Sequence, residues 1–330
     1  MQKKLFAVAD IGGTNGRFAI FADKGTGLEL AAKKWVPTAQ LANTEDILAA
    51  FAKWESAAIT SGAISYFGNG ASSLDANDFA AIVIAIAGPV CEGRGCLSNA
   101  CLEIDLRKAD FPCLARLVND FEVQAWASLA PCGQNARLIA GPDSDIHETK
   151  AVIGAGTGLG VAALVPDRTG WRALPSEAGH MNFPFLGKKE EDFHSFLCSR
   201  LDLRFARGDD TITGRGLEIL HEYLTGEKIT AREVGEKALQ SPTPTLEWYS
   251  RFYARACRNW MLATLCNGGL WIAGGIAAQN PLTVASPFFM AELYNAPEDY
   301  LQKMPVRLIE DKDSGLWGGA WLARQIAIQD

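Results

Sequence analysis

The sequence contains no segment that is long and apolar enough to cross a membrane or to direct secretion. Its longest apolar run, residues 79–87, ends at Gly88-Pro89, whereas a helix that spans a bilayer needs about 20 such residues. The apolar stretch 5–9 is interrupted by Asp10 and is shorter than the hydrophobic region of a secretion signal. We expect a cytoplasmic protein without a membrane partner, in which residues 79–87 form a buried strand.

The sequence also lacks an excess of positive charge and a pattern of paired cysteines. It has 31 Lys and Arg against 38 Asp and Glu, so it offers no broad cationic surface for nucleic-acid phosphates. Its 8 cysteines include no C-x-x-C pair, and a chain of 330 residues can bury a core without disulfides. We expect an α/β protein with reduced thiols and no nucleic-acid partner.

Two common nucleotide-binding motifs are missing. The only Gly-Lys pair, Gly187-Lys188, is followed by Lys189 rather than by Ser or Thr, which excludes a Walker A loop. The segment Gly154-Ala-Gly-Thr-Gly-Leu-Gly160 places glycine at every second position and leads into a strand-like run instead of a helix. That spacing disfavours a Rossmann dinucleotide site.

The glycines that are present form two similar patterns of strand, turn and strand. Apolar runs flank the turn 10–16, Asp-Ile-Gly-Gly-Thr-Asn-Gly, and residues 151–164 repeat the pattern. Sliding one onto the other matches Gly13-Thr14 with Gly156-Thr157, at an offset of 143 residues (157 minus 14). The repeat favours two α/β lobes built on one duplicated plan.

Such turns suit phosphate groups. Glycines let backbone N–H groups approach an anion, and Thr14 and Thr157 add a hydroxyl to each turn. A single turn of this kind is also compatible with a plain hairpin. The two copies, together with a third glycine pair at Gly274-Gly275, favour a polyphosphate site.

Polar residues at predicted strand ends are further candidates, because ligands bind beyond the carboxyl ends of strands in open α/β sheets. Asp10 could hold magnesium against nucleotide phosphates or only cap its own turn. Asn119 and Asp120 follow a strand, and Asp120 could accept a proton from an attacking hydroxyl or cap a helix. Glu177 and His180 could bind several hydroxyls of one sugar, although a lone His is also compatible with a core position.

The motifs together resemble those of bacterial-type ATP-dependent glucokinases. The resemblance runs from Leu5 to about Ala323 and rests on five segments in the order of that family: Asp10-Ile-Gly-Gly-Thr-Asn-Gly-Arg17, Leu117-Val-Asn-Asp-Phe121, Gly154-Ala-Gly-Thr-Gly-Leu-Gly160, Glu177-Ala-Gly-His180 and Ile272-Ala-Gly-Gly-Ile276. It implies a two-lobed actin/hexokinase-like fold, an α/β architecture of the duplicated ribonuclease H-like type, with a cleft between the lobes. The expected lobes are residues 1–130 plus 315–330, the smaller, and residues 131–314, the larger.

The same resemblance implies a role for each matching residue. ATP and magnesium would be the cofactors, and Asp10 would bind the magnesium directly or through water. The ATP contacts would come from the two turns and the glycine pair: Gly12, Gly13, Thr14, Asn15, Gly156, Thr157, Gly158, Gly274 and Gly275. Asp120 would be the catalytic base at the primary hydroxyl of the sugar. The sugar would be bound by Asn99, Asn119, Asp120, Glu177, His180 and Asp209.

Some positions depart from the family. The family usually has Thr-Asn followed by Trp, where this chain has Ser98-Asn99-Ala100 and no Trp. A sugar-contacting Glu of the family falls at Asp209, ahead of Gly214-Arg215-Gly216, and the side chain is one methylene shorter. Residues 181–189, where related repressor/kinase proteins carry a zinc loop, contain no cysteine, so no structural zinc is expected.

We therefore predict a glucokinase of glycolysis, which transfers the γ-phosphoryl group of ATP to the 6-hydroxyl of glucose and yields glucose 6-phosphate and ADP. The departures near Asn99 and at Asp209 leave a kinase for fructose, mannose or an N-acetylated sugar as an alternative. A non-catalytic sugar sensor on the same fold is a second alternative. The resemblance also implies a homodimer.

Overall fold

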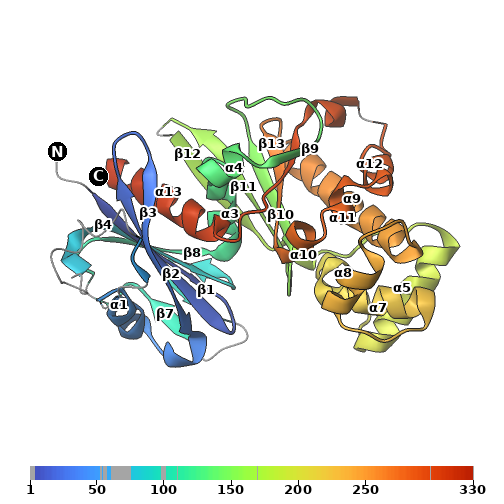
Figure 1. The fold of residues 1–330 in the computed structure, drawn as a ribbon, viewed down its shortest axis with the longest axis horizontal. Helices are drawn as coiled ribbons and strands as arrows, with labels where there is room; N and C mark the ends of the chain where they lie inside the picture. Colours follow the sequence, from blue (N-terminus) through green and yellow to red (C-terminus); the bar gives the residue numbers. More distant parts are fainter. Residues whose placement is uncertain are drawn as a thin grey trace. The chain divides into compact units, whose positions relative to one another are not determined.

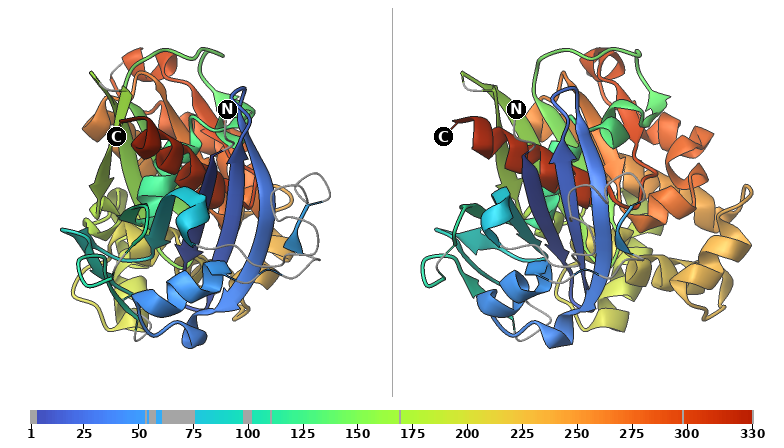
Figure 2. Two further views of the ribbon diagram at one scale, coloured as in Figure 1. Left: turned by 90° about the vertical axis from the view of Figure 1, so that its left-hand side faces the viewer. Right: turned by 60° about the vertical axis from the view of Figure 1, so that its left-hand side comes forward.

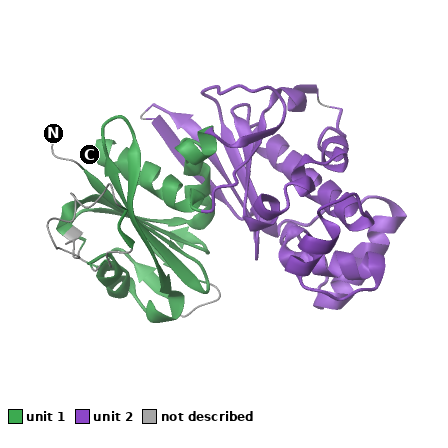
Figure 3. Cartoon of the chain, in the orientation of Figure 1, with its two compact units in different colours: residues 1–134, 313–330 green, residues 135–312 purple. Residues whose placement is uncertain are grey.

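The computed structural model describes residues 4–52, 54, 58–60, 76–97, 102–109, 111–168, 170–297 and 299–329. The expected sugar-binding residue Asn99 lies outside the described residues. Contacts between residues divide the chain into two compact units (Figure 3): unit 1 is Met1–Gln134 with Asp313–Asp330, and unit 2 is Asn135–Lys312. Unit 1 is thus assembled from two segments that are far apart in the sequence.

Unit 1 is built on a sheet whose strands lie in the order β3-β2-β1-β4-β8 (Figure 1). Antiparallel pairs join β1 to β2 and β2 to β3, whereas β4 and β8 continue the sheet parallel to β1. The bounds are Leu5–Ile11 (β1), Asn15–Asp23 (β2), Leu28–Pro37 (β3), Phe79–Ile86 (β4) and Leu114–Asn119 (β8). The apolar run 79–87 forms the interior strand β4, as predicted, and it is buried because both faces of the sheet are covered.

Glycines let helix α13 (Ser314–Gln329) lie close to one face of this sheet and to α3 (Asp120–Ala127). A Cβ at Gly318 would overlap the carbonyl oxygen of Val123 in α3, and a Cβ at Gly319 would lie 2.5 Å from Cγ1 of Val8. Because side chains alternate along a strand, Asp10 faces the same side of the sheet as Val8. The face of β1 that meets α13 therefore ends in a carboxylate.

The opposite face of the sheet carries an apolar core. Ala7 and Ala9 of β1 and Phe18 of β2 belong to one cluster with Ile47 and Phe51 of α1 (Thr44–Ala52). The rings of Phe18 and Phe51 meet edge to face, with centroids 5.1 Å apart. The connections hold short elements: η1 (Thr38–Gln40), η4 (Ala76–Asp78), α4 (Pro131–Gln134) and a small sheet of β5 (Val90–Cys91), β6 (Arg94–Cys96) and β7 (Glu103–Asp105). The strands β1, β2 and β3 are the blue strands that lie side by side in Figure 2.

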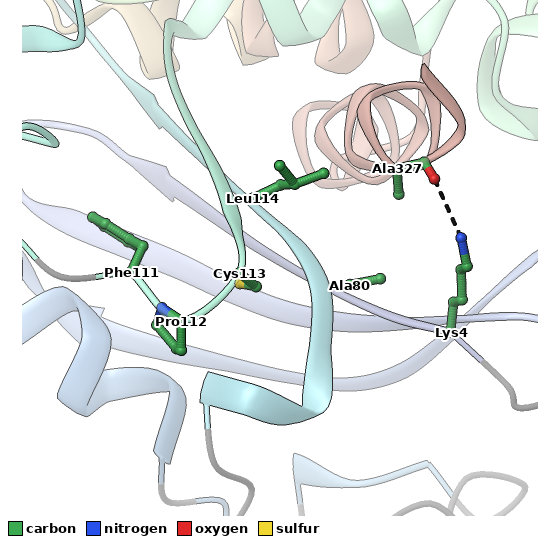
Figure 4. Close-up of a pocket in the computed structure, with 7 residues that line it drawn as sticks. All are labelled: Lys4, Ala80, Phe111, Pro112, Cys113, Leu114 and Ala327. Carbon is green, nitrogen blue, oxygen red and sulfur yellow. Dashed lines mark hydrogen bonds between the residues drawn. The ribbon is translucent and has the colours of Figure 1, made fainter. Parts of the chain in front are cut away.

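A pocket of about 550 Å³ lies where β4 and β8 begin (Figure 4). Lys4 Nζ donates to the carbonyl oxygen of Ala327 at 3.2 Å on one side, and burial raises the pKa of the Cys113 thiol to about 11 on the other. The lining residues are Lys4, Ala80, Phe111, Pro112, Cys113, Leu114 and Ala327. None of them is a predicted site residue, because those of unit 1 follow the carboxyl ends of the strands.

Unit 2 repeats this plan on a second sheet, in the order β12-β11-β10-β13-β14-β9. Antiparallel pairs join β10 to β11 and β11 to β12, β13 and β14 continue parallel to β10, and β9 pairs antiparallel with β14. The bounds are Arg137–Ala140 (β9), Lys150–Ala155 (β10), Leu159–Asp167 (β11), Gly170–Ser176 (β12), Gly269–Ala273 (β13) and Val306–Leu308 (β14). Apart from β9, these strands match those of unit 1 in order and direction, which confirms the predicted duplication.

The two hairpin turns differ by one residue. The pairing of β1 with β2 leaves residues 12–15 between its last partners, and the pairing of β10 with β11 leaves residues 156–158. The alignment of Thr14 with Thr157 is therefore a likeness between two turns and not an equivalence residue by residue.

Helix α9 (Pro244–Thr264) ties the helices of unit 2 to this sheet. The Tyr253 hydroxyl accepts a hydrogen bond from Ala155 N at 3.2 Å, and Trp260 Nε1 donates to the carbonyl oxygen of Ala162 at 3.3 Å. None of the helices in the described part of the chain is both long and apolar enough to span a membrane. The other helical elements are η5 (Ala178–His180), α5 (Gly187–Leu201), α6 (Gly208–Ile212), α7 (Gly214–Thr225), α8 (Ala231–Ala238), α10 (Gly275–Gln279), α11 (Leu282–Ala285), α12 (Pro287–Leu293) and η6 (Asp299–Lys303).

A buried ion-pair network joins α9 to α5 and α12. Arg255 of α9 is 1% exposed, and its guanidinium contacts Glu190 Oε2 at 2.6 Å and Glu292 Oε1 at 2.9 Å. Burial opposes the ionisation of Glu292, but hydrogen bonds and the charges of Arg255 and Arg258 outweigh it, so the pKa of Glu292 is lowered. Three helices are thus held together by charges that have few water molecules to screen them.

Candidate functional site

Asp10 lies buried at the carboxyl end of β1, on the face that meets α13. Its carboxylate forms an ion pair with Arg17, which the strand register places directly opposite Asp10 in β2. A Cβ at Gly315 would lie 2.5 Å from Asp10 Oδ2, so the first turn of α13 admits the carboxylate only because this residue is glycine. Asp10 is thus fixed in place immediately before the first glycine turn.

The first turn, residues 12–15, is fastened by Thr38. The Thr38 hydroxyl donates to the carbonyl oxygen of Gly12 at 2.7 Å, and Thr38 N donates to that of Thr14 at 2.9 Å. Gly13, Thr14 and Asn15 are exposed. The turn therefore presents its backbone and the Thr14 side chain beyond the edge of the sheet in a fixed shape.

Asn119 lies at the same edge of the sheet as this turn. The parallel registers align Ile11, Ile86 and Asn119 side by side, so two strand spacings, about 10 Å, separate Asn119 from the end of β1. The Asn119 amide donates through Nδ2 to the carbonyl oxygen of Gly88 at 3.0 Å. The carboxyl ends of neighbouring strands in unit 1 thus place two predicted site segments at one edge.

Asp120 begins helix α3 but does not cap it. The cap is Asn119, whose Oδ1 accepts from Phe121 N at 2.8 Å. Asp120 is half-buried in the first turn of the helix, where the helix dipole favours negative charge. The sequence allowed Asp120 to be either a proton acceptor or a helix cap, and the structure assigns the cap to Asn119.

The second turn, residues 156–158, is held from two sides within unit 2. The carbonyl oxygen of Gly156 accepts from Gly214 N, at the start of α7, at 3.1 Å. Asp209 Oδ1 accepts from Leu159 N, at the start of β11, at 2.7 Å. A Cβ at Gly158 would lie 3.0 Å from that same oxygen of Asp209. One predicted sugar-binding residue thus fixes a predicted phosphate-binding turn.

The glycine pair 274–275 lies beside this turn, because β13 pairs parallel with β10. Gly274 has a φ of 92°, and a Cβ there would lie 2.6 Å from the carbonyl oxygen of Ala155. Both the backbone conformation and the close approach therefore require glycine. The structure brings together the expected ATP contacts of unit 2: Gly156, Thr157, Gly158, Gly274 and Gly275.

Glu177 and His180 flank the segment that packs on the start of β11. A Cβ at Gly179 would overlap the carbonyl oxygen of Leu159, so η5 approaches the strand closely. The side chains of Glu177 and His180 are 58% and 51% exposed, and Glu177 Oε2 lies 3.4 Å from His180 Nε2. A hydrogen-bond acceptor and an imidazole are thus presented together at the surface of unit 2.

Arg207 links this pair to Asp209. Its Nη1 lies 3.4 Å from His180 Nδ1, and its Nη2 lies 3.9 Å from Asp209 Oδ2. Two hydrogen bonds hold the guanidinium on Asp210, from Nε to Oδ2 at 2.8 Å and from Nη2 to Oδ1 at 2.9 Å. Burial opposes ionisation of Asp210, but the Arg207 hydrogen bonds and charge outweigh it and lower the pKa of Asp210. The hydrogen bond to Asp210 in turn raises the pKa of Arg207.

The predicted site residues fall into two groups, one in each unit, apart from Asn99, which is not described. The group in unit 1 follows β1 and β8: Asp10, Gly12, Gly13, Thr14, Asn15, Asn119 and Asp120. The group in unit 2 follows β10, β12 and β13 and includes α6: Gly156, Thr157, Gly158, Glu177, His180, Asp209, Gly274 and Gly275.

Three residues that support these groups, Thr38, Tyr253 and Arg207, were not predicted from the sequence. Thr38 reaches Gly12 from 26 residues away, and Tyr253 reaches Ala155 from 98 residues away, so no local pattern marks either residue. Arg207 has a weak signal, because Arg and Asp three residues apart often pair at the start of a helix.

The surroundings of Asp10 fit a magnesium ion that nucleotide phosphates and water would hold in large part. No group of three His, Cys, Asp or Glu in the described residues could hold a metal by itself. Asp10 supplies one carboxylate beside a glycine turn and shares it with Arg17. Magnesium in kinases is bound by one or two carboxylates together with substrate phosphates. A magnesium ion at Asp10 would therefore need the nucleotide as a further ligand.

The chain is similar to curated glucokinases over most of its length. The Glucokinase family model matches residues 7–326. The glucokinase of Brucella suis is 28% identical over an alignment that covers 96% of this chain and 90% of the relative. That of Sinorhizobium fredii is 29% identical, with coverage of 96% and 91%.

Solved structures show the same fold. A glucokinase from an Antarctic psychrotroph has a TM-score of 0.77 at 21% identity and covers 97% of this chain and 99% of its own. The Balamuthia mandrillaris glucokinase, solved with glucose, has a TM-score of 0.75 at 19% identity, with coverage of 98% and 94%. A ROK family glucokinase from Streptomyces griseus, solved with glucose and AMPPNP, has a TM-score of 0.58 at 20% identity, with coverage of 98% and 99%. The expected actin/hexokinase-like fold is thereby confirmed. Since the family model spans nearly the whole chain, the protein belongs to the glucokinase family and is an ATP-dependent hexose kinase.

Proposed function

We propose that the hexose is glucose and that the γ-phosphoryl group of ATP is transferred to its 6-hydroxyl, which gives glucose 6-phosphate and ADP. The observation that carries the proposal is the cluster of Glu177, His180 and Asp209, which gathers acceptors and a donor for sugar hydroxyls at one place in unit 2. The names of the curated relatives and the glucose bound to two solved relatives support it.

In the proposed reaction, the oxygen of the sugar 6-hydroxyl bonds to the γ-phosphorus while the bond from that phosphorus to the ADP oxygen breaks. The carboxylate of Asp120 accepts the proton that the 6-hydroxyl loses. Asn119 orients the sugar beside it. Phosphoryl transfer passes through a loose transition state, so positioning and charge neutralisation account for most of the catalysis. The turns 12–15 and 156–158 would bind phosphate oxygens, and magnesium at Asp10 would supply neutralising positive charge.

A coupled assay of ADP release with a panel of hexoses tests this proposal. Glucose should give the highest kcat/KM, above those of fructose, mannose and N-acetylated sugars. A higher kcat/KM for another hexose would replace glucose as the substrate. Glucose binding without ADP release would contradict the proposal and favour a sugar sensor.

Magnesium as the ion that accompanies ATP, a cytoplasmic location and a homodimeric state also belong to the proposal, and each rests on the resemblance to the family. EDTA should abolish ADP release, and added magnesium should restore it. Light scattering on the eluting protein would give the mass of the assembly, for which a homodimer is twice the chain mass of 35.6 kDa.

A further inference from the structure

Arg207 is held more firmly than a helix cap requires. Its Nε and Nη2 both donate to Asp210, and Asp210 Oδ2 also accepts from the backbone N of Arg207 at 3.0 Å. These contacts close the start of α6 and use two of the three nitrogen atoms of the guanidinium. The third, Nη1, takes no part in the cap and lies 3.4 Å from His180 Nδ1.

This contact favours one of the two neutral tautomers of His180. A guanidinium has only donors, so the Nδ1 atom that faces it must accept a hydrogen bond. In a neutral imidazole the proton is then on Nε2, on the side where Glu177 Oε2 lies 3.4 Å away. His180 therefore presents an N–H donor beside the acceptor oxygens of Glu177.

Backbone contacts keep the two side chains together. The segments that carry His180 and Arg207 run side by side: Gly208 N donates to the carbonyl oxygen of Met181 at 3.1 Å, and Phe183 N donates to that of Ala206 at 3.0 Å. These hydrogen bonds fix Arg207 relative to His180, which the capping of α6 alone does not require.

We propose that Arg207 is a positioning residue for the hexose, because it fixes the tautomer and orientation of His180 so that Nε2 donates to a sugar hydroxyl. The inference rests on the proposed function and deepens it. A hydroxyl that donates to Glu177 and accepts from His180 satisfies both of its hydrogen-bonding roles. The opposite tautomer would place two acceptors side by side and would bind the same hydroxyl less well.

Nitrogen-15 NMR of the free protein tests the tautomer without any substrate. The chain has 4 histidines, and the His180 signals are identified as those missing from His180→Gln. In the wild type, His180 should show a protonated Nε2 and an unprotonated Nδ1. In Arg207→Met, the two tautomers should become mixed. A protonated Nδ1 in the wild type, or an unchanged tautomer in Arg207→Met, would overturn the proposal.

Steady-state kinetics test the consequence for the sugar. Arg207→Met should raise the KM for the hexose about tenfold, which is the effect of losing one hydrogen bond, here the one from His180 Nε2 to a sugar hydroxyl beside the Glu177 carboxylate. The kcat and the KM for ATP should change little. The matched control is Arg200→Met. Arg200 is also in unit 2, but it pairs with Glu222, at 2.7 Å, and not with Asp210 or His180. Equal effects of the two substitutions would overturn the proposal.

A double-mutant cycle separates a positioning role from a general loss of structure. If Arg207 acts through His180, Arg207→Met should add nothing to the KM of His180→Gln, and additive effects would contradict the proposal. If Arg207→Met fails to fold by circular dichroism, Arg207→Lys replaces it, because one ammonium cannot contact both Asp210 and His180 as the fork does. If the protein turned over no hexose, the proposed function would fail, while the NMR experiment would still decide the Arg207 contact.

Discussion

At the scale of single residues, the adjacent positions Asn119 and Asp120 divide two tasks. The Asn119 side chain accepts from Phe121 N at the start of α3 and donates to the carbonyl oxygen of Gly88, so it has two structural partners. Asp120 is half-buried and is not the cap. Proton transfer needs a carboxylate, which Asp120 has and the Asn119 amide lacks, and replacing Asp120 should leave the cap at Asn119 in place.

We predict that Asp120→Asn lowers kcat about 10²-fold or more, because the amide has the shape of the carboxylate but cannot accept the proton of the sugar hydroxyl. The KM for ATP should stay near its wild-type value. Glu122→Gln, the same chemical change in the same helix turn, is the control and should retain most of the activity. Turnover within a few-fold of wild type for Asp120→Asn in steady-state kinetics would remove Asp120 from the base role.

Residues in the glycine turns could be predicted because their signal is local. Position 274 requires glycine because its φ is 92° and the backbone of Ala155 lies close to it. A glycine pair after an apolar run predicts such a turn from the sequence. Thr38 and Arg207 act on the same turns and side chains through contacts that only the folded chain creates. The sequence therefore predicted the turns themselves but not the residues that fasten them.

At the scale of elements, strands with two covered faces were the most predictable. Strand β4 is an apolar run that ends at a Gly-Pro pair, so its composition alone indicated a buried strand. Strand β12 lies at the edge of its sheet and mixes partly buried with exposed residues, so it has no apolar run to detect. The repeated hairpin pointed to the duplicated sheet, whereas the pairing of β10 with β13, more than 100 residues apart, followed only from the fold.

The ion-pair network between α5, α9 and α12 gives an element-scale prediction. Arg255→Met should lower the free energy of unfolding by about 3 kcal/mol, because Glu190 and Glu292 would stay buried without the arginine they share and would keep only Arg251 and Arg258. Urea unfolding followed by circular dichroism measures the change. Arg232→Met is the control, because Arg232 is 86% exposed and pairs with an exposed Glu236. A loss no larger than that of the control would contradict a structural role for the network.

The same network predicts a pH dependence. The pKa of Glu292 in the folded protein is below its ordinary value of 4.5, so the ionised carboxylate contributes stability above that value and the contribution is lost as the pH falls through the folded pKa. In Arg255→Met the burial remains, and the hydrogen bond and charge of Arg255 are lost while Arg258 stays, so the pKa of Glu292 should rise. Acid unfolding should then begin at a higher pH than in the wild type, and an unchanged onset would argue against the pairing.

At the scale of the whole molecule, unit 1 depends on helix α13, which follows unit 2 in the sequence. Helix α13 packs on α3, β1 and β4, and its Trp317 ring lies 4.9 Å from that of Phe21. Unit 2 is one continuous stretch with its own core around α9. The two units should therefore respond differently when α13 is removed.

We predict that deleting residues 313–330 unfolds unit 1, since the apolar face of β1 and β4 loses its cover, while unit 2 keeps its structure. Hydrogen exchange should show amides of β1 and β4 losing protection and those of β10 and β13 keeping it. As a control, a peptide of residues 313–330 added to the shortened chain should restore protection in β1. Retained protection of β1 without the peptide would contradict the dependence of unit 1 on α13.

This arrangement sets an order on folding during synthesis. The ribosome makes β1 and β4 first and α13 only after all of unit 2, so the growing chain carries an uncovered sheet face through the translation of 178 residues (135–312). Unit 2 can complete its core in that interval, while the N-terminal strands remain exposed to chaperones and to other nascent chains. Mutations that slow the packing of α13 onto the sheet should therefore reduce the yield of folded enzyme in cells more than they reduce the free energy of unfolding of the finished protein.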